Sequence, residues 1–62
     1  MTNDSIKTMD TNILLSIINT KLRDQYASLD NLCYDLEITK ENILNKLKTI
    51  GYNYNETENR FK

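Results

Sequence analysis

Polar side chains that can hydrogen-bond to nucleic-acid bases recur along one segment in the second half of the chain. Asn42, Asn45 and Thr49 are spaced three and four residues apart, so a helix would place them on one face. Asn makes two hydrogen bonds to adenine in the major groove, and Thr can contact a base edge. Glu41 lies on the same face, and Lys46 and Lys48 flank it, where they could contact phosphate. The pattern predicts either a face that binds duplex DNA or an ordinary solvated helix face.

Other basic residues could extend this surface. Lys40 lies in the first turn of the same segment, and Arg60 and Lys62 lie near the C-terminus. Residues 39–51 hold three Lys and one Glu, a local charge of +2, whereas residues 28–37 hold three acidic residues and no basic one, a local charge of −3. The candidate nucleic-acid-binding residues are therefore Lys40, Asn42, Asn45, Lys46, Lys48, Thr49 and Arg60.

Few residues of this chain are suited to covalent or metal chemistry. Its 62 residues include no His and one Cys, Cys33. A nucleophile needs an adjacent base, and no such pair or Gly-rich phosphate loop is present. A zinc site would need Asp and Glu for nearly all its ligands, which is an improbable set. We expect no catalytic activity, no metal and no cofactor, and we expect Cys33 to be a small buried residue in a reducing compartment.

The overall charge limits how the chain could bind nucleic acid. Eight Lys and Arg against nine Asp and Glu give a net charge of −1, which disfavours non-specific coating of nucleic acid. Specific binders commonly neutralise about six to ten phosphates, more than this chain can direct at one duplex. A monomer would bind weakly, so a dimer or a larger complex would be needed. The alternative function is a protein-interaction or homodimerisation module without nucleic-acid binding.

The first predicted helix runs from Thr11 to Asp24, with Asp10 as its N-cap. Its apolar residues cover an arc of roughly 200°, wider than one ordinary buried face. This helix is therefore either the central helix of the core or partly available to a second copy or another protein. The arc consists of Ile13, Leu14, Leu15, Ile17, Ile18 and Leu22.

The second predicted helix is short and runs from Leu29 to Leu36, with Ser28 as its N-cap. Its apolar residues fall at i, i+3, i+4 and i+7, the spacing of one helical stripe. Glu37 and Ile38 then form a tight connection. The stripe consists of Leu29, Leu32, Cys33 and Leu36.

The third predicted helix follows with Thr39 as its N-cap. Ile38 before the cap and Ile43 after it have the spacing of a hydrophobic staple, which fixes the angle of entry into the helix. Gly51, the one glycine, stands where a left-handed residue would end the helix. The inward residues of this helix are Ile43, Leu44, Leu47 and Ile50.

A short hairpin is predicted after Gly51. Aromatic and polar residues alternate over 52–54 and again over 60–62, on either side of the polar turn 55–59. Because an isolated hairpin is marginal in water, its aromatic residues should pack on the helices. The residues expected to do so are either Tyr52 or Tyr54, together with Phe61.

The stretch Ser28–Leu36, then Ile38, then Leu44–Tyr54 resembles the winged helix-turn-helix of many bacterial repressors. Those proteins insert the second helix of the motif into the DNA major groove. Cys33 supplies the small residue needed where the two helices cross. Glu37 departs from the pattern, because many such motifs have Gly at the turn.

Most of the chain, from Asp10 to Lys62, also resembles a family of short bacterial proteins catalogued only as a domain of unknown function. This resemblance implies a bacterial setting and no activity. The residues that carry it are Asn19–Asp24, Ser28–Asp30, Gly51–Tyr54 and Asn59–Phe61.

The sequence therefore predicts a mainly α protein, a three-helix winged helix-turn-helix with a short C-terminal β-hairpin. Residues 10–62 would form the single domain, and the polar residues 1–9 a disordered tail. The longest apolar run, Ile13–Leu15, is too short to span a membrane, and the N-terminus lacks a signal peptide, so we expect a cytoplasmic protein. The predicted function is DNA binding in transcriptional control.

Overall fold

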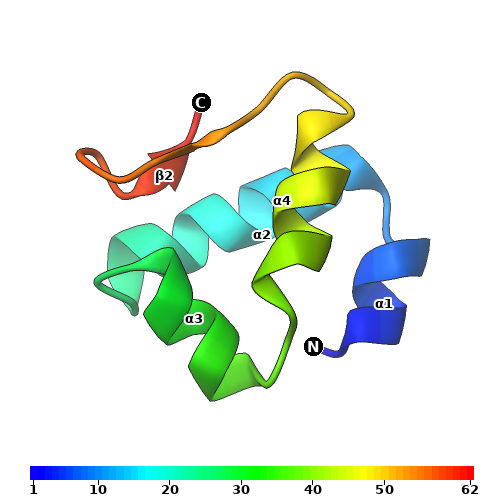
Figure 1. The fold of residues 1–62 in the computed structure, drawn as a ribbon, viewed down its shortest axis with the longest axis horizontal. Coiled ribbons are helices and arrows are strands. Elements are labelled where there is room, and N and C mark those ends of the chain that lie inside the picture. Colours follow the sequence, from blue (N-terminus) through cyan, green and yellow to red (C-terminus); the bar gives the residue numbers. More distant parts are fainter.

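The computed structural model describes residues 1–62 as four helices followed by a two-stranded antiparallel hairpin (Figure 1). It confirms a mainly helical chain with a C-terminal hairpin. The elements are α1 (Asn3–Thr8), α2 (Thr11–Asp24), α3 (Leu29–Leu36), α4 (Lys40–Lys48), β1 (Tyr54–Asn55) and β2 (Arg60–Phe61).

The prediction of three helices is wrong, because part of the predicted tail 1–9 forms α1. The side chains of Thr2 and Ser5 each accept a hydrogen bond from the other residue's backbone, which caps the helix at its N-terminus. Ile6 is fully buried. One apolar residue among polar ones leaves no periodic signal, and tertiary packing rather than local propensity holds this short helix in place.

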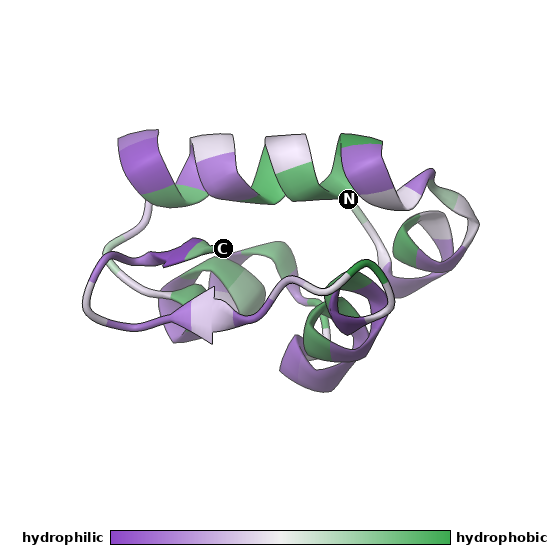
Figure 2. Cartoon of the chain, turned by 90° about the horizontal axis from the view of Figure 1, so that it is seen from above, coloured by the Kyte–Doolittle hydropathy of each residue, from purple (hydrophilic) through white to green (hydrophobic).

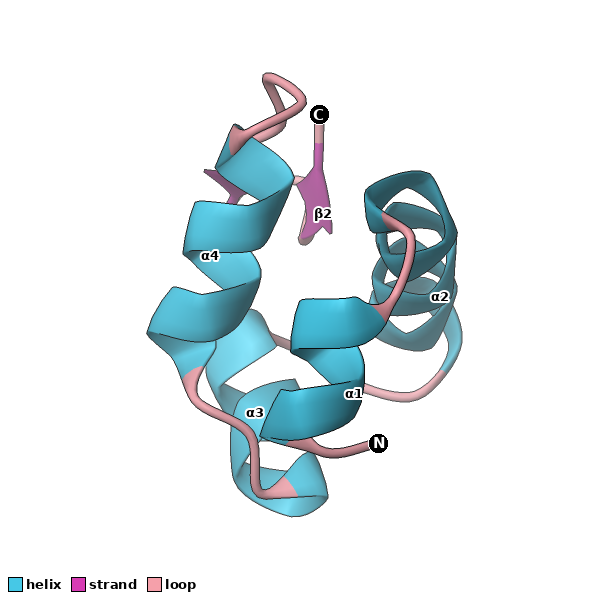
Figure 3. Ribbon diagram, turned by 90° about the vertical axis from the view of Figure 1, so that its right-hand side faces the viewer, coloured by secondary structure: helices cyan, strands magenta, loops and turns pink.

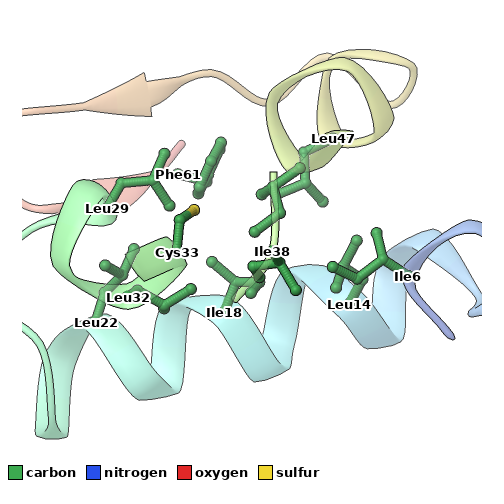
Figure 4. Packing of buried hydrophobic residues seen from close by; sticks show 11 residues of the cluster. Ile6, Leu14, Ile18, Leu22, Leu29, Leu32, Cys33, Ile38, Leu47 and Phe61 are labelled. Carbon is green, nitrogen blue, oxygen red and sulfur yellow. The ribbon is translucent and has the colours of Figure 1, made fainter. Parts of the chain in front are cut away.

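The core lies between α2 and the other elements. The apolar residues of α2 gather mainly on the side that faces the rest of the chain (Figure 2). Leu14, Ile18 and Leu22 are buried, whereas Ile13 is 56% exposed. The core therefore uses most of the wide apolar arc of α2. The buried cluster (Figure 4) consists of Ile6, Leu14, Ile18, Leu22, Leu29, Leu32, Cys33, Ile38, Ile43, Leu47 and Phe61.

Two of the three predicted N-caps are confirmed. The Asp10 carboxylate accepts hydrogen bonds from the Asn12 and Ile13 amides at 2.9 and 3.2 Å. The Ser28 hydroxyl accepts one from the Asn31 amide at 3.1 Å. Thr39 occupies the N-cap position of α4, but its side chain makes no capping bond.

Left-handed residues shape the ends of α3 and α4. Glu37 ends α3 with φ 56° and ψ 44°, and the next amide, that of Ile38, donates to the Cys33 carbonyl at 3.0 Å. Gly51 follows α4 with φ 81°, as predicted. A left-handed conformation is strained for most residues and not for glycine, so Glu37 carries a strain that Gly51 avoids.

The hairpin is shorter than predicted, since Tyr52 lies outside β1 and is 36% exposed. Tyr54 pairs with Phe61 and Asn55 with Arg60. The Tyr54 and Phe61 rings lie 5.5 Å apart at an angle of 52°. Phe61 is 2% exposed and belongs to the core, so the hairpin is packed on the helices, as predicted.

Candidate functional site

Helix α4 turns part of its predicted binding face to solvent. Ile43 and Leu47 are fully buried, so the opposite side of the helix faces outward. Asn45, Lys48 and Thr49 are exposed there. Thr49 donates its hydroxyl proton to the Lys46 carbonyl at 2.6 Å, a bond to its own helix. The side chains of Asn45 and Lys48 make no hydrogen bond or ion pair within the chain, so their polar groups are available to a ligand.

The other flank of α4 is covered by α1. The Asn42 amide donates to Asn3 Oδ1 at 3.2 Å and is partly buried. The Lys46 ammonium donates to the Lys7 carbonyl at 2.8 Å. The predicted single outward face is therefore divided, because Asn42 and Lys46 are engaged inside the molecule. Sequence periodicity could not reveal this, since it does not show what packs against a helix.

Lys40 is paired with a carboxylate. Its ammonium lies 2.9 Å from Asp30 Oδ1, and this hydrogen bond together with the Asp30 charge raises the pKa of Lys40. The pair joins the first turn of α4 to α3, so the charge of Lys40 is compensated within the chain.

Arg60 lies on the hairpin, where its guanidinium is 3.4 Å from Glu58 Oε1. Glu58 also pairs with Lys62, and that hydrogen bond is the main reason that the pKa of Glu58 is lowered. The structure thus leaves Asn45, Lys48 and Thr49 together on one exposed surface, while Arg60 belongs to a different part of the molecule.

An open groove of about 570 Å³ lies between α2 and the hairpin. Arg60 lies on one side of the groove and Arg23 on the other. Arg23 makes two hydrogen bonds to Asp24, at 2.8 and 3.1 Å. Arg60 is paired with Glu58. Both guanidinium groups already have a carboxylate partner, so the groove has no unmatched charge to select a ligand. Its other lining residues are Ser16, Asn19, Thr20, Leu22, Glu58 and Asn59.

Sequence reasoning missed a polar network that fixes the hairpin to the helices. The Asn59 amide donates to the carbonyls of Leu22 and Tyr26, at 3.1 and 2.9 Å, at the C-terminal end of α2. Tyr54 donates its hydroxyl proton to Asn59 Oδ1 at 2.6 Å and accepts from the Leu29 amide at 3.2 Å. Asn59 has φ 53°, and an Asn in a turn is the sequence signal that could have indicated such a residue.

Cys33 is 6% exposed in the core. Burial raises the pKa of its thiol, and the negative charge of Asp30 raises it further. A thiol of this kind stays protonated near neutral pH and is a poor nucleophile. The cysteine and carboxylate groups do not gather into any cluster that could hold a metal ion. None of the four helices combines the length and apolar character that crossing a membrane requires.

Comparison with protein families gives one match. The family model described as "Domain of unknown function (DUF4250)" matches residues 8–61. The chain belongs to this family. Within the DUF4250 match lie α2, α3, α4 and the hairpin, whereas α1 lies outside it except for Thr8. No match was found among curated proteins or among solved structures.

Proposed function

We propose that this DUF4250 protein binds duplex DNA through α4, as a small winged helix-turn-helix-like protein in transcriptional control. The order α2, α3, tight turn, α4, hairpin agrees with that motif, in which the helix after the turn enters the major groove. Glu37 has a left-handed backbone at the turn where many such motifs have glycine. The observation that carries the proposal is the exposed side of α4, with Asn45 and Lys48 free of intrachain partners.

The proposed contacts follow from the chemistry of these side chains. Asn45 would make two hydrogen bonds to an adenine edge, and Lys48 would bind a neighbouring phosphate. Thr49 would exchange its bond to the Lys46 carbonyl for one to the DNA. Asn42, Lys40 and Arg60 contribute less than the sequence indicated, because each is already bonded within the chain.

The expected affinity is low. Lys7 and Lys48 lie on α1 and α4 and form no ion pair with a carboxylate, whereas the Lys46 ammonium is bonded to the Lys7 carbonyl. If Lys7 and Lys48 neutralise about two phosphates, the slope of log K against log salt is about −2. Binding by one copy is therefore weak and is lost at moderate salt, so paired sites or a larger assembly would supply the remaining affinity.

The test is fluorescence anisotropy of a labelled duplex at low salt with two variants of equal charge change. Lys48→Glu places a negative charge on the proposed DNA-binding side of α4, and Lys21→Glu makes the same change on α2. We expect the wild-type protein to bind, Lys48→Glu to lose at least about tenfold in affinity, and Lys21→Glu to lose much less. Equal losses, or no binding by the wild type, would reject the proposal.

The exposed apolar residues of α2 favour a second candidate, a homodimerisation module. Ile13 is 56% exposed, and Ile17, one turn later, is half-buried and lies outside the core cluster. Two copies could bury this pair against each other. Sedimentation equilibrium of the wild type and of Ile13→Ser tests this: a dimer that Ile13→Ser weakens supports it, and a strict monomer at high concentration rejects it.

A further inference from the structure

Helix α1 packs along one flank of α4 (Figure 3). Ile6 inserts into the core cluster and, with Leu14, forms one end of it (Figure 4). The rest of the contact is polar and involves side chains that the sequence assigned to DNA binding. The position of α1 therefore decides which part of α4 is open to solvent.

Asn3 makes most of the polar contacts between α1 and the start of α4. Its Oδ1 accepts from the Thr39 amide at 2.9 Å and from the Asn42 side chain at 3.2 Å. Its Nδ2 donates to Thr39 Oγ1 at 3.4 Å. Asn3 thus holds the N-cap residue of α4 by both its backbone amide and its hydroxyl.

Lys46 makes the matching contact at the other end of α1. Its ammonium donates to the Lys7 carbonyl at 2.8 Å, where it satisfies a carbonyl of the last turn and complements the helix dipole. While α1 is docked, the Asn42 amide and the Lys46 ammonium are therefore committed to α1. The Asn42 Nδ2 that donates to Asn3 is also one of the two Asn42 groups that would contact an adenine edge.

The attachment of α1 is limited compared with that of the other helices. It has six residues, well below the roughly 12–15 that an isolated helix needs to form in water. Ile6 is its one buried residue. The helix also lies almost entirely outside residues 8–61, which the family model matches. Helix α1 is thus a short element held by one buried side chain and a few polar contacts.

We propose that α1 is a displaceable latch that regulates α4, and this inference rests on the proposed DNA binding. In the closed state, α4 offers Asn45, Lys48 and Thr49. In the open state, it also offers Asn42 and Lys46. A ligand that needs the open state binds with an affinity reduced by the fraction of molecules that are open. Loosening α1 should therefore strengthen DNA binding although it removes contacts from the folded chain.

The test compares two uncharged substitutions in the full-length protein. Asn3→Ala removes the hydrogen bonds to Thr39 and Asn42. Thr8→Ala is the matched control, because the Thr8 hydroxyl donates only to carbonyls of α1 itself. Amide hydrogen exchange followed by NMR reports the opening of α1, and anisotropy with a labelled duplex reports binding. Ile6→Ala is a second loosening variant.

We expect Asn3→Ala to speed exchange of the Ile6 and Met9 amides and to strengthen duplex binding, each by about tenfold, with α2–α4 protected as before. Thr8→Ala should leave both the exchange of these amides and the affinity for duplex nearly unchanged. The latch would be overturned if the α1 amides exchange faster in both loosening variants while duplex binding is unchanged or weaker. It would also be overturned if Asn3→Ala leaves the exchange of the α1 amides unchanged. If no variant and no wild-type sample binds duplex, the proposed function fails and the latch fails with it. Binding that is equal in all samples rejects the latch alone.

Discussion

The side chain of Asn19 satisfies both polar groups of the Phe61 backbone. The Phe61 amide donates to Asn19 Oδ1 at 2.8 Å, and Asn19 Nδ2 donates to the Phe61 carbonyl at 3.1 Å. Asn19 lies in α2, so one side-chain amide serves β2 as a neighbouring strand would. This pairing lets a hairpin of two short strands end against a helix without unsatisfied backbone groups.

Asn19→Ala should therefore destabilise the protein by about 2 kcal/mol, since it leaves two partly buried backbone groups of Phe61 without partners. Asn12→Ala is the control, because Asn12 is exposed on the same helix and replacing it changes the intrinsic helix propensity in the same way. Urea denaturation measures both free energies of unfolding. Equal stability of the two variants would show that the amide pairing contributes nothing.

The hydrogen bonds from the Asn59 side chain to two backbone carbonyls should contribute a similar amount to the free energy of unfolding. Asn59→Gly keeps a residue suited to φ 53° but removes the donor to the Leu22 and Tyr26 carbonyls. We expect a loss of about 2 kcal/mol in the free energy of unfolding from these missing hydrogen bonds. Asn59→Asp, which keeps an acceptor for the Tyr54 hydroxyl but cannot donate, should lose at least as much in the same urea titration. A neutral Asn59→Gly would contradict the proposed role of the amide.

Glu37→Gly should stabilise the protein. Glu37 has φ 56° at the end of α3, a conformation that glycine adopts without strain. We expect a gain of about 0.5–1 kcal/mol, offset in part by the greater freedom of glycine in the unfolded chain. Thermal melting followed by circular dichroism should show an increase of a few degrees, while Glu37→Ala should show none. A lower melting temperature for Glu37→Gly would mean that the Glu37 side chain makes a stabilising contribution of its own.

Tyr26 provides a prediction about alkaline pH. Its hydroxyl donates to Asp35 Oδ2 at 2.6 Å, and this bond, with burial and the Asp35 charge, raises the pKa of Tyr26 above its usual 10.0. The folded state thus favours the protonated phenol, so this contribution to stability is complete below the unfolded pKa and disappears as pH rises through the folded one. Asp35→Asn should lower the pKa of Tyr26 in a titration of tyrosinate absorbance. An unchanged titration curve would contradict this coupling.

Local signals predicted much of the fold. Asp10 and Ser28 are caps because a short polar side chain precedes an apolar helical stripe, and such capping depends only on residues close in sequence. Gly51 has its left-handed conformation for a similarly local reason. Ile38 and Ile43, predicted to pack together, both lie in the buried cluster.

Long-range contacts account for the differences. Asn3 and Asn42 are far apart in the sequence, so no periodic pattern indicates that one covers the other. The expectation that Asn42 and Lys46 face solvent assumed that nothing packs on that flank of α4. A single buried residue, Ile6, brings α1 there. The same limitation applies to Arg60, which the hairpin places beside α2.

The central proposal is that α4 binds DNA with its exposed side, and NMR chemical-shift mapping with a short duplex at low salt tests it most directly. The proposal predicts the largest shifts at the amides of Asn45, Lys48 and Thr49, fading as salt is added. Shifts concentrated around Ile13 and Ile17 on α2, or a spectrum that the duplex leaves unchanged, would contradict it.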